Sequence, residues 1–165
     1  MSRDTSEWSR RAVIALAGAV AATGPGAASA QDVGRGNAKV VDGVLAYLGV
    51  VPAEIVRGFP RGHPEGAMHG GVPRGRHLCH LVLALFDAIT GERIEANRVS
   101  VAVAGIGHVG MTRLDLDPMT IADTVTWGAF VRLPGRGLYD LTFSVWVADR
   151  TAAIVLPFRY AHPAG

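Results

Sequence analysis

The stretch LPGRGLYDLTFSV, residues 133–145, decides the fold class of this chain. It begins with a Pro-Gly turn signal, and apolar and polar residues then alternate one by one. Tyr139, Leu141, Phe143 and Val145 would share one face of an extended segment, because successive side chains on a strand point to opposite sides. The alternation predicts a turn followed by a strand over residues 138–147 that buries one face.

Other segments repeat this pattern at intervals of about ten residues, with turn signals between them. Sustained helical periodicity and internal repeats are both missing from the sequence. We therefore expect an all-β chain, an immunoglobulin-like antiparallel β-sandwich of about seven strands. The further strands are predicted at residues 39–51 (one or two strands around the turn Asp42-Gly43), 77–87, 98–103, 111–116, 125–133 and 153–160.

A Gly/Pro-rich loop is predicted at residues 52–76, just before the longest apolar strand. Residues 53–57 are expected to form a short turn at most. A loop of this length without secondary structure of its own is uncommon in a compact domain and is often functional.

The first thirty residues have the three parts of a secretory signal. Arg10 and Arg11 precede the apolar run 12–22, and the small-residue sequence Ala28-Ser29-Ala30 precedes Gln31. The run is too short for a transmembrane helix, which needs about 20 residues. A twin-arginine signal and a general secretory signal both remain open, because the arginine pair lacks the aromatic residue that usually follows it. The sequence predicts export to the periplasm and cleavage after Ala30.

Cleavage would leave a disordered leader at residues 31–38 and one β-sandwich domain at residues 39–165, with no membrane span. Three of the 16 basic and two of the 14 acidic residues fall in the signal, so the remainder carries 13 and 12, a net charge of +1. Nothing in this balance indicates a nucleic-acid partner. Cys79 is the only cysteine, which excludes an intramolecular disulfide.

Two phrases resemble those of a known group of proteins. LFDAITGERI (residues 85–94) and LPGRGLYDLTFSV are similar to hairpin and late-strand sequences of the YtkA-like/FixH-like group and of related periplasmic metal-handling sandwiches. RGHPEGAMHGG (residues 61–71) and LALFDAITGER (residues 83–93) also resemble a family of exported proteobacterial proteins with no settled activity. The resemblance covers about residues 75–160, and it implies an extracytoplasmic immunoglobulin-like domain.

Residues that commonly bind metal ions are clustered in and just after the Gly/Pro-rich loop. A thioether beside an imidazole suits Cu(I) first and then Cu(II) or Zn. Met68 and His69 are the expected primary ligands of a copper ion, and His80, His63 or Met119 would complete the shell. Glu65 or Asp123 could hold the second nitrogen of a ligand imidazole. The alternative is that these histidines are ordinary solvated loop residues.

Cys79 lies between His77 and His80, and the three cannot share one side of a regular strand. Either His80 joins the loop histidine, or His77 does so with Cys79 behind it. A buried and inert Cys79 is the commoner outcome for such an apolar setting.

Catalytic motifs such as G-x-S-x-G, H-E-x-x-H and a phosphate loop are missing from the sequence. We therefore expect a periplasmic, non-enzymatic metal-binding or metal-delivery protein, with copper ahead of iron, that passes the ion to an acceptor. The alternative is an immunoglobulin-like accessory module that pairs with another envelope protein and holds no metal.

Overall fold

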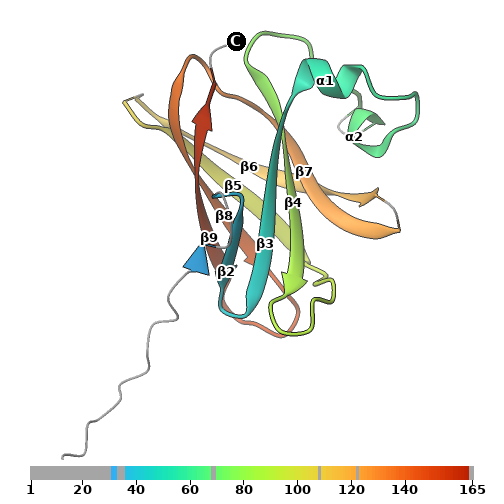
Figure 1. Ribbon diagram of the computed structural model, residues 1–165, viewed down its shortest axis with the longest axis vertical. Coiled ribbons are helices and arrows are strands. Elements are labelled where there is room, and N and C mark those ends of the chain that lie inside the picture. The colour runs from blue at the N-terminus through green and yellow to red at the C-terminus, as the bar shows by residue number, and fades with distance from the viewer. Residues whose placement is uncertain (1–30, 33–35, 68–69, 108, 122, 164–165) are drawn as a thin grey trace, which may run out of the picture.

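The computed structural model describes residues 31–163 apart from 33–35, 68–69, 108 and 122. The described residues form an all-β domain with two short helices (Figure 1). The elements are β1 (Gln31–Asp32), β2 (Ala38–Val41), β3 (Val44–Pro52), α1 (Ala53–Arg57), α2 (Pro64–Ala67), β4 (Leu78–Asp87), β5 (Arg98–Gly105), β6 (Met111–Ile121), β7 (Thr124–Arg132), β8 (Gly137–Trp146) and β9 (Ile154–His162).

The strands form two antiparallel layers joined through β6. Their order is β1-β2-β3-β4-β7-β6-β5-β8-β9. The first layer runs from β1 to the second half of β6, and the second layer contains the first half of β6 with β5, β8 and β9. Strands β3, β4, β7 and β6 facing β5, β8 and β9 reproduce the two-sheet order of an immunoglobulin constant-type sandwich. The predicted fold class is confirmed.

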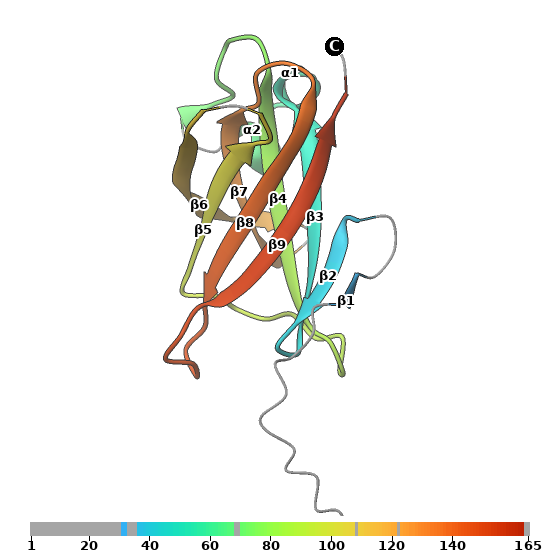
Figure 2. The same cartoon turned by 90° about the vertical axis from the view of Figure 1, so that its left-hand side faces the viewer.

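The two outer strands of the sandwich also approach each other, so that the sheet nearly closes on itself (Figure 2). Strand β2 packs against β9, and Lys39 Nζ lies 5.8 Å from the centre of the Phe158 ring.

The hydrophobic core lies between the layers and follows the predicted alternation. Tyr139, Leu141, Phe143 and Val145 of β8 are all buried, whereas their neighbours along the strand are more exposed. The core residues of β4 are Cys79, Leu81, Leu83 and Leu85, so the even-numbered residues of β4 lie on the outer face of the first layer. We call this surface the outer face.

Tyr139 fixes the turn that leads into β8. Its hydroxyl donates a hydrogen bond of 2.5 Å to the carbonyl oxygen of Pro134, five residues upstream. This is the tyrosine corner of immunoglobulin-like sandwiches, in which a tyrosine near the start of the sixth strand bonds back to the preceding turn.

Strand β6 is longer than the prediction of residues 111–116, because it changes partner and continues to Ile121. Residues up to Leu116 pair with β5, and residues from Asp117 onward pair with β7. Pro118 is tolerated within the strand because proline is accepted where a strand has an unpaired edge. Beyond Leu116, β6 no longer pairs with β5, which leaves such an edge.

Three further expectations need correction or fall outside the described residues. The predicted leader 31–38 is not disordered throughout, because β1 pairs with β2 and Ala38 belongs to β2; backbone pairing at an edge does not need apolar side chains. Residues 53–57 form the helix α1 and not merely a turn. The predicted signal, residues 1–30, lies outside the described residues. Within the described part of the chain, no helix is long and apolar enough to cross a membrane.

Candidate metal centre

His80 is the buried histidine at the centre of the candidate site. It lies on β4 between the core residues Cys79 and Leu81, so its ring points away from the core and onto the outer face. The side chain is nevertheless fully buried, at 0% exposure. A buried imidazole is costly unless polar groups surround it, so the segment that covers it must supply such groups.

Glu65 of α2 supplies one of these groups. Its Oε2 lies 3.4 Å from Nδ1 of His80, and its side chain is mostly buried. A proton on Nδ1 that is donated to this carboxylate makes Nε2 the nitrogen that carries the lone pair. Carboxylate contact with one ring nitrogen is how proteins orient a histidine that binds a metal through the other. Of the two acceptors predicted from the sequence, Glu65 is the one that meets a histidine.

Gly128 on β7 leaves space in front of His80. A Cβ placed on this glycine would lie 2.7 Å from Nε2 of His80 and 2.6 Å from Cε of Met119, both closer than real Cβ contacts. The register explains this arrangement, because Gly128 pairs with Val82 on one side and with Asp117 on the other. His80 lies two residues before Val82 on β4, and Met119 lies two residues after Asp117 on β6, so both side chains lean over the glycine from opposite directions.

Met119 belongs to the second half of β6, where that strand pairs with β7. Its side chain is only 4% exposed, and because Met119 pairs with Thr126, it lies on the same outer face as Thr126 and Gly128. The change of partner after Leu116 therefore decides its position. If β6 ended there, as the sequence predicted, Met119 would lie in a loop and not beside His80.

Phe130 forms the other wall of the site. It pairs with His80 across β4 and β7, and the two ring centres lie 4.6 Å apart at an angle of 31°. Phe130 also lines a surface pocket of about 340 Å³ between the loop after α2 and strands β6 and β7. The site thus lies at the edge of a depression in the outer face. The pocket is lined by Gly71, Pro73, Leu114, Asp115, Ala129 and Phe130.

His63 immediately precedes α2, the helix that carries Glu65. Its ring packs on Phe59, with ring centres 4.6 Å apart, and its Nδ1 is buried without a hydrogen-bond partner among the described residues. We call the connection between β3 and β4, residues 53–77, the covering segment. His63 belongs to it, and its buried Nδ1 could bind an ion. Met68 and His69, the expected primary ligands, lie outside the described residues.

Cys79 and His77 do not belong to the site. Cys79 is a core residue at 1% exposure, and burial followed by the charge of Glu54 raises the pKa of its thiol. His77 precedes β4 in a left-handed backbone conformation, with φ of 60°, and its side chain is exposed. His80 contacts Glu65 of α2, and whether it also joins the loop histidine stays a prediction, because His69 lies outside the described residues.

The arrangement brings together an imidazole nitrogen, a thioether and a carboxylate that orients the imidazole. Among the described residues, no group of three or more His, Cys, Asp or Glu side chains has the spacing of a metal site. A methionine is not counted in such a group, and thioether with imidazole is the ligand set that favours Cu(I). The residues that are present therefore suit a soft ion.

Two residues of the site, Gly128 and Phe130, were not predicted from the sequence. A glycine inside a strand marks a place where another group approaches the backbone closely, and Gly128 stands within the predicted strand 125–133. Gly128 therefore indicated a close contact with its backbone, but the sequence did not identify His80 and Met119 as the residues in contact. Phe130 carried no signal of its own, because an aromatic residue in a strand is usually part of the core.

Comparisons with known proteins match the fold. No protein-family model matches the chain. No curated protein matches it either. Among solved structures, a copper-bound variant of FetP from uropathogenic Escherichia coli has a TM-score of 0.58 at 13% identity, covering 77% of this chain and 94% of that one.

Two other solved structures match comparably. Copper-reconstituted P19 from Campylobacter jejuni has a TM-score of 0.56 at 14% identity, covering 77% of this chain and 93% of that one. A DUF4426 family protein from Pseudomonas aeruginosa has a TM-score of 0.57 at 13% identity, with coverages of 82% and 94%. The resemblance to the YtkA-like/FixH-like group stays a prediction. The chain thus has the same fold as FetP, P19 and the DUF4426 protein.

Proposed function

We propose that this chain is an exported, non-enzymatic copper-binding protein that holds the ion on the outer face, between β4 and β6. The observation that carries the proposal is the meeting of His80 Nε2 and Met119 over Gly128. Any side chain at position 128 would fill this space, and position 128 is occupied by glycine, which has no side chain.

The chemistry of the donors supports copper over harder ions. Mg²⁺ and Ca²⁺ prefer oxygen ligands, whereas an imidazole nitrogen and a thioether sulfur suit Cu(I). His80 and Met119 would hold the ion, and Glu65 would orient His80. FetP and P19, which have the same fold, support the same ion, because solved structures of both proteins contain copper.

The covering segment is where the remaining ligands of the proposed site would come from. His63 precedes Glu65 by two residues and has a buried nitrogen without a described partner. Met68 and His69 follow Glu65 by three and four residues, so the chain allows them within about 11 to 14 Å of it. Delivery to an acceptor would need some ligands to come from a segment that can move, and a loop with two short helices offers this more readily than a strand.

Copper affinity measured by competition with a chromophoric Cu(I) chelator tests the proposal. The two variants His80→Asn and Met119→Leu should each weaken Cu(I) binding by tenfold or more. The matched controls His162→Asn and Met111→Leu change the same residue types away from the outer face, and they should bind like the wild type. Circular dichroism spectra of all four would establish that they are folded.

Equal copper affinity in the wild type, His80→Asn and Met119→Leu would refute the proposed site. If the wild type also retains no copper, the chain is better described by the alternative, an accessory module of the envelope without a metal. Copper affinity that depends on Met68→Ala and His69→Ala but not on His80→Asn would place the ion on the covering segment alone.

A further inference from the structure

The small net charge of the chain conceals two ends of opposite sign. The strand register brings seven strand ends together at one end of the sandwich. These are the ends of β3, β5, β7 and β9 and the starts of β4, β6 and β8. We call this the arginine end. Hydrogen bonds connect its loops, since Leu133 N donates to the carbonyl oxygen of His77 and Ile106 N donates to that of Leu138.

Six exposed arginines lie at the arginine end, against only two carboxylates, Glu54 and Glu65. None of the six forms an ion pair among the described residues. Four of them belong to the connection between β3 and β4, and two belong to the end of β7 and the turn that follows it. The six are Arg57, Arg61, Arg74, Arg76, Arg132 and Arg136.

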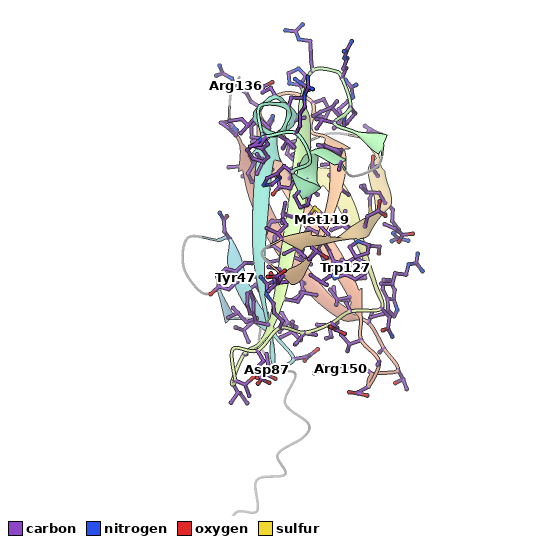
Figure 3. All side chains as sticks on the ribbon, turned by 90° about the vertical axis from the view of Figure 1, so that its right-hand side faces the viewer. Tyr47, Asp87, Met119, Trp127, Arg136 and Arg150 are labelled. Carbon is purple, nitrogen blue, oxygen red and sulfur yellow. The ribbon has the colours of Figure 1, made fainter. Side chains whose placement is uncertain are left out.

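The opposite end of the long axis is acidic. Figure 3 shows Arg136 at one end and Asp87 with Arg150 at the other. Hydrogen bonds from Ala88 N to Gly43 and from Arg150 to Asp42 hold these opposite loops together. This end carries six carboxylates and three arginines: Asp42, Asp87, Glu92, Glu95, Asp123 and Asp149, with Arg93, Arg98 and Arg150.

Exposed aliphatic side chains accompany the six arginines. Val109 at the tip of the β5–β6 hairpin is fully exposed, and Ile55, Ile106 and Leu138 are each 42 to 54% exposed. Ile55 belongs to α1, Ile106 and Val109 lie in the loop between β5 and β6, and Leu138 is the second residue of β8. Aliphatic groups at the tips of loops, set among arginines, are suited to the boundary between lipid headgroups and acyl chains.

We propose that the arginine end binds the surface of an anionic phospholipid bilayer. The arginines would contact phosphate groups, for which the guanidinium fork is well matched, and Val109 would enter the headgroup region. The acidic end would then face away from the membrane. An acidic protein surface would also attract the arginines, but it would give the aliphatic tips no role. The proposal does not rest on copper binding, although Glu65 belongs both to the arginine end and to the candidate copper site.

Sedimentation with vesicles tests this proposal, using the chain as purified after export. Vesicles of equal parts phosphatidylglycerol and phosphatidylcholine should bind the protein, and vesicles of phosphatidylcholine alone should not. Each arginine near the surface contributes about fivefold to binding, so Arg61→Gln/Arg76→Gln/Arg136→Gln should lose about a hundredfold. These three arginines make no described hydrogen bond, so the variant should keep its fold.

The control is Arg113→Gln/Arg150→Gln/Arg159→Gln, which removes the same charge from exposed positions outside the six arginines. Arg150 and Arg159 donate hydrogen bonds to Asp42 and Asp140, so circular dichroism spectra should first establish that this variant is folded. It should bind vesicles within a few-fold of the wild type. Val109→Ser, which leaves the charge unchanged, should weaken binding to vesicles and leave binding to soluble polyglutamate unchanged. Free glycerophosphate in the millimolar range should not compete, because the surface needs many phosphates held in one plane.

Equal loss in both triple variants would overturn the proposal, because attraction would then depend on net charge and not on the arginine end. Binding to polyglutamate as tight as binding to vesicles, with both unaffected by Val109→Ser, would overturn it in favour of an acidic protein partner. Competition by free glycerophosphate would overturn it in favour of a site for a single phosphate.

Discussion

His80 and Met119 lean over the same glycine from opposite sides, although one belongs to β4 and the other to β6. Strand β7 lies between them and contributes Gly128 at the point where they meet. Pairing with β7 brings the second half of β6 to the same face as β4. The candidate site is therefore formed by residues of β4, β6 and β7 together with Glu65 of the covering segment.

Gly128→Ala should abolish copper binding and reduce stability. The added methyl would lie 2.6 Å from Met119 and 2.7 Å from His80. Met119 could move, but His80 is fixed by Glu65 and Phe130, so overpacking should cost about 1–3 kcal/mol. Urea unfolding and chelator competition would measure the two effects.

Gly49→Ala is the matched control for Gly128→Ala, because its added methyl would lie at an ordinary distance of 3.5 Å from Val82. This variant should keep both stability and copper affinity. A Gly128→Ala protein with unchanged copper affinity would show that the space above Gly128 does not hold the ion.

Glu65→Gln should weaken copper binding by about 10- to 100-fold, the usual effect of removing a group that orients a metal-binding histidine. The amide can still contact His80, but it no longer favours the proton on Nδ1. Chelator competition measures the affinity, and Glu54→Gln is the control because Glu54 is an exposed carboxylate of α1. Equal affinities in the two variants would argue against a role for Glu65.

Cys79 should be unreactive in the folded protein. Burial raises the pKa of its thiol, so little thiolate forms near neutral pH, and the reactive species is the thiolate. A chromogenic disulfide reagent should report no free thiol at pH 8 in buffer and one free thiol in urea. Rapid labelling in buffer would contradict the described burial, and loss of copper affinity in Cys79→Ala would contradict the proposed ligand set.

Tyr139→Phe should destabilise the domain by about 0.5–1.5 kcal/mol, because it removes the hydrogen bond to Pro134 and leaves the ring in the core. Tyr160→Phe is the control, since no hydrogen bond of its hydroxyl is described. Urea unfolding at constant pH compares the two variants. Equal free energies of unfolding would show that the tyrosine corner adds nothing to stability here.

Asp87 should contribute to the pH dependence of stability on the acid side. Its carboxylate accepts hydrogen bonds of 2.8 Å from the backbone N–H groups of Ile89 and Thr90, and the bond from Thr90 is the larger cause of its lowered pKa. Because the folded pKa lies below the unfolded pKa, this contribution is present above pH 4 and is lost as the pH falls further. Asp87→Asn keeps an acceptor oxygen, so its stability should fall less steeply below about pH 4. Parallel curves for both proteins would refute this origin.

The sequence by itself determined the fold class, because alternation with a period of two specifies strands and their buried face without reference to distant residues. Tyr139, Leu141, Phe143 and Val145 are buried as predicted. The same local logic placed Asp42-Gly43 in the turn between β2 and β3 and identified His80, Met119 and Glu65 as residues of interest.

Only the tertiary structure decided which of these residues meet and where charge accumulates. The sequence could not show that β6 changes partner at Leu116, because pairing between strands is a long-range property. Nor could the sequence show that arginines gather at one end of the domain and carboxylates at the other, because a net charge of +1 does not say where the charged residues lie. Contacts between segments far apart in sequence depend on register and topology, and these are fixed by the packing of the whole sandwich.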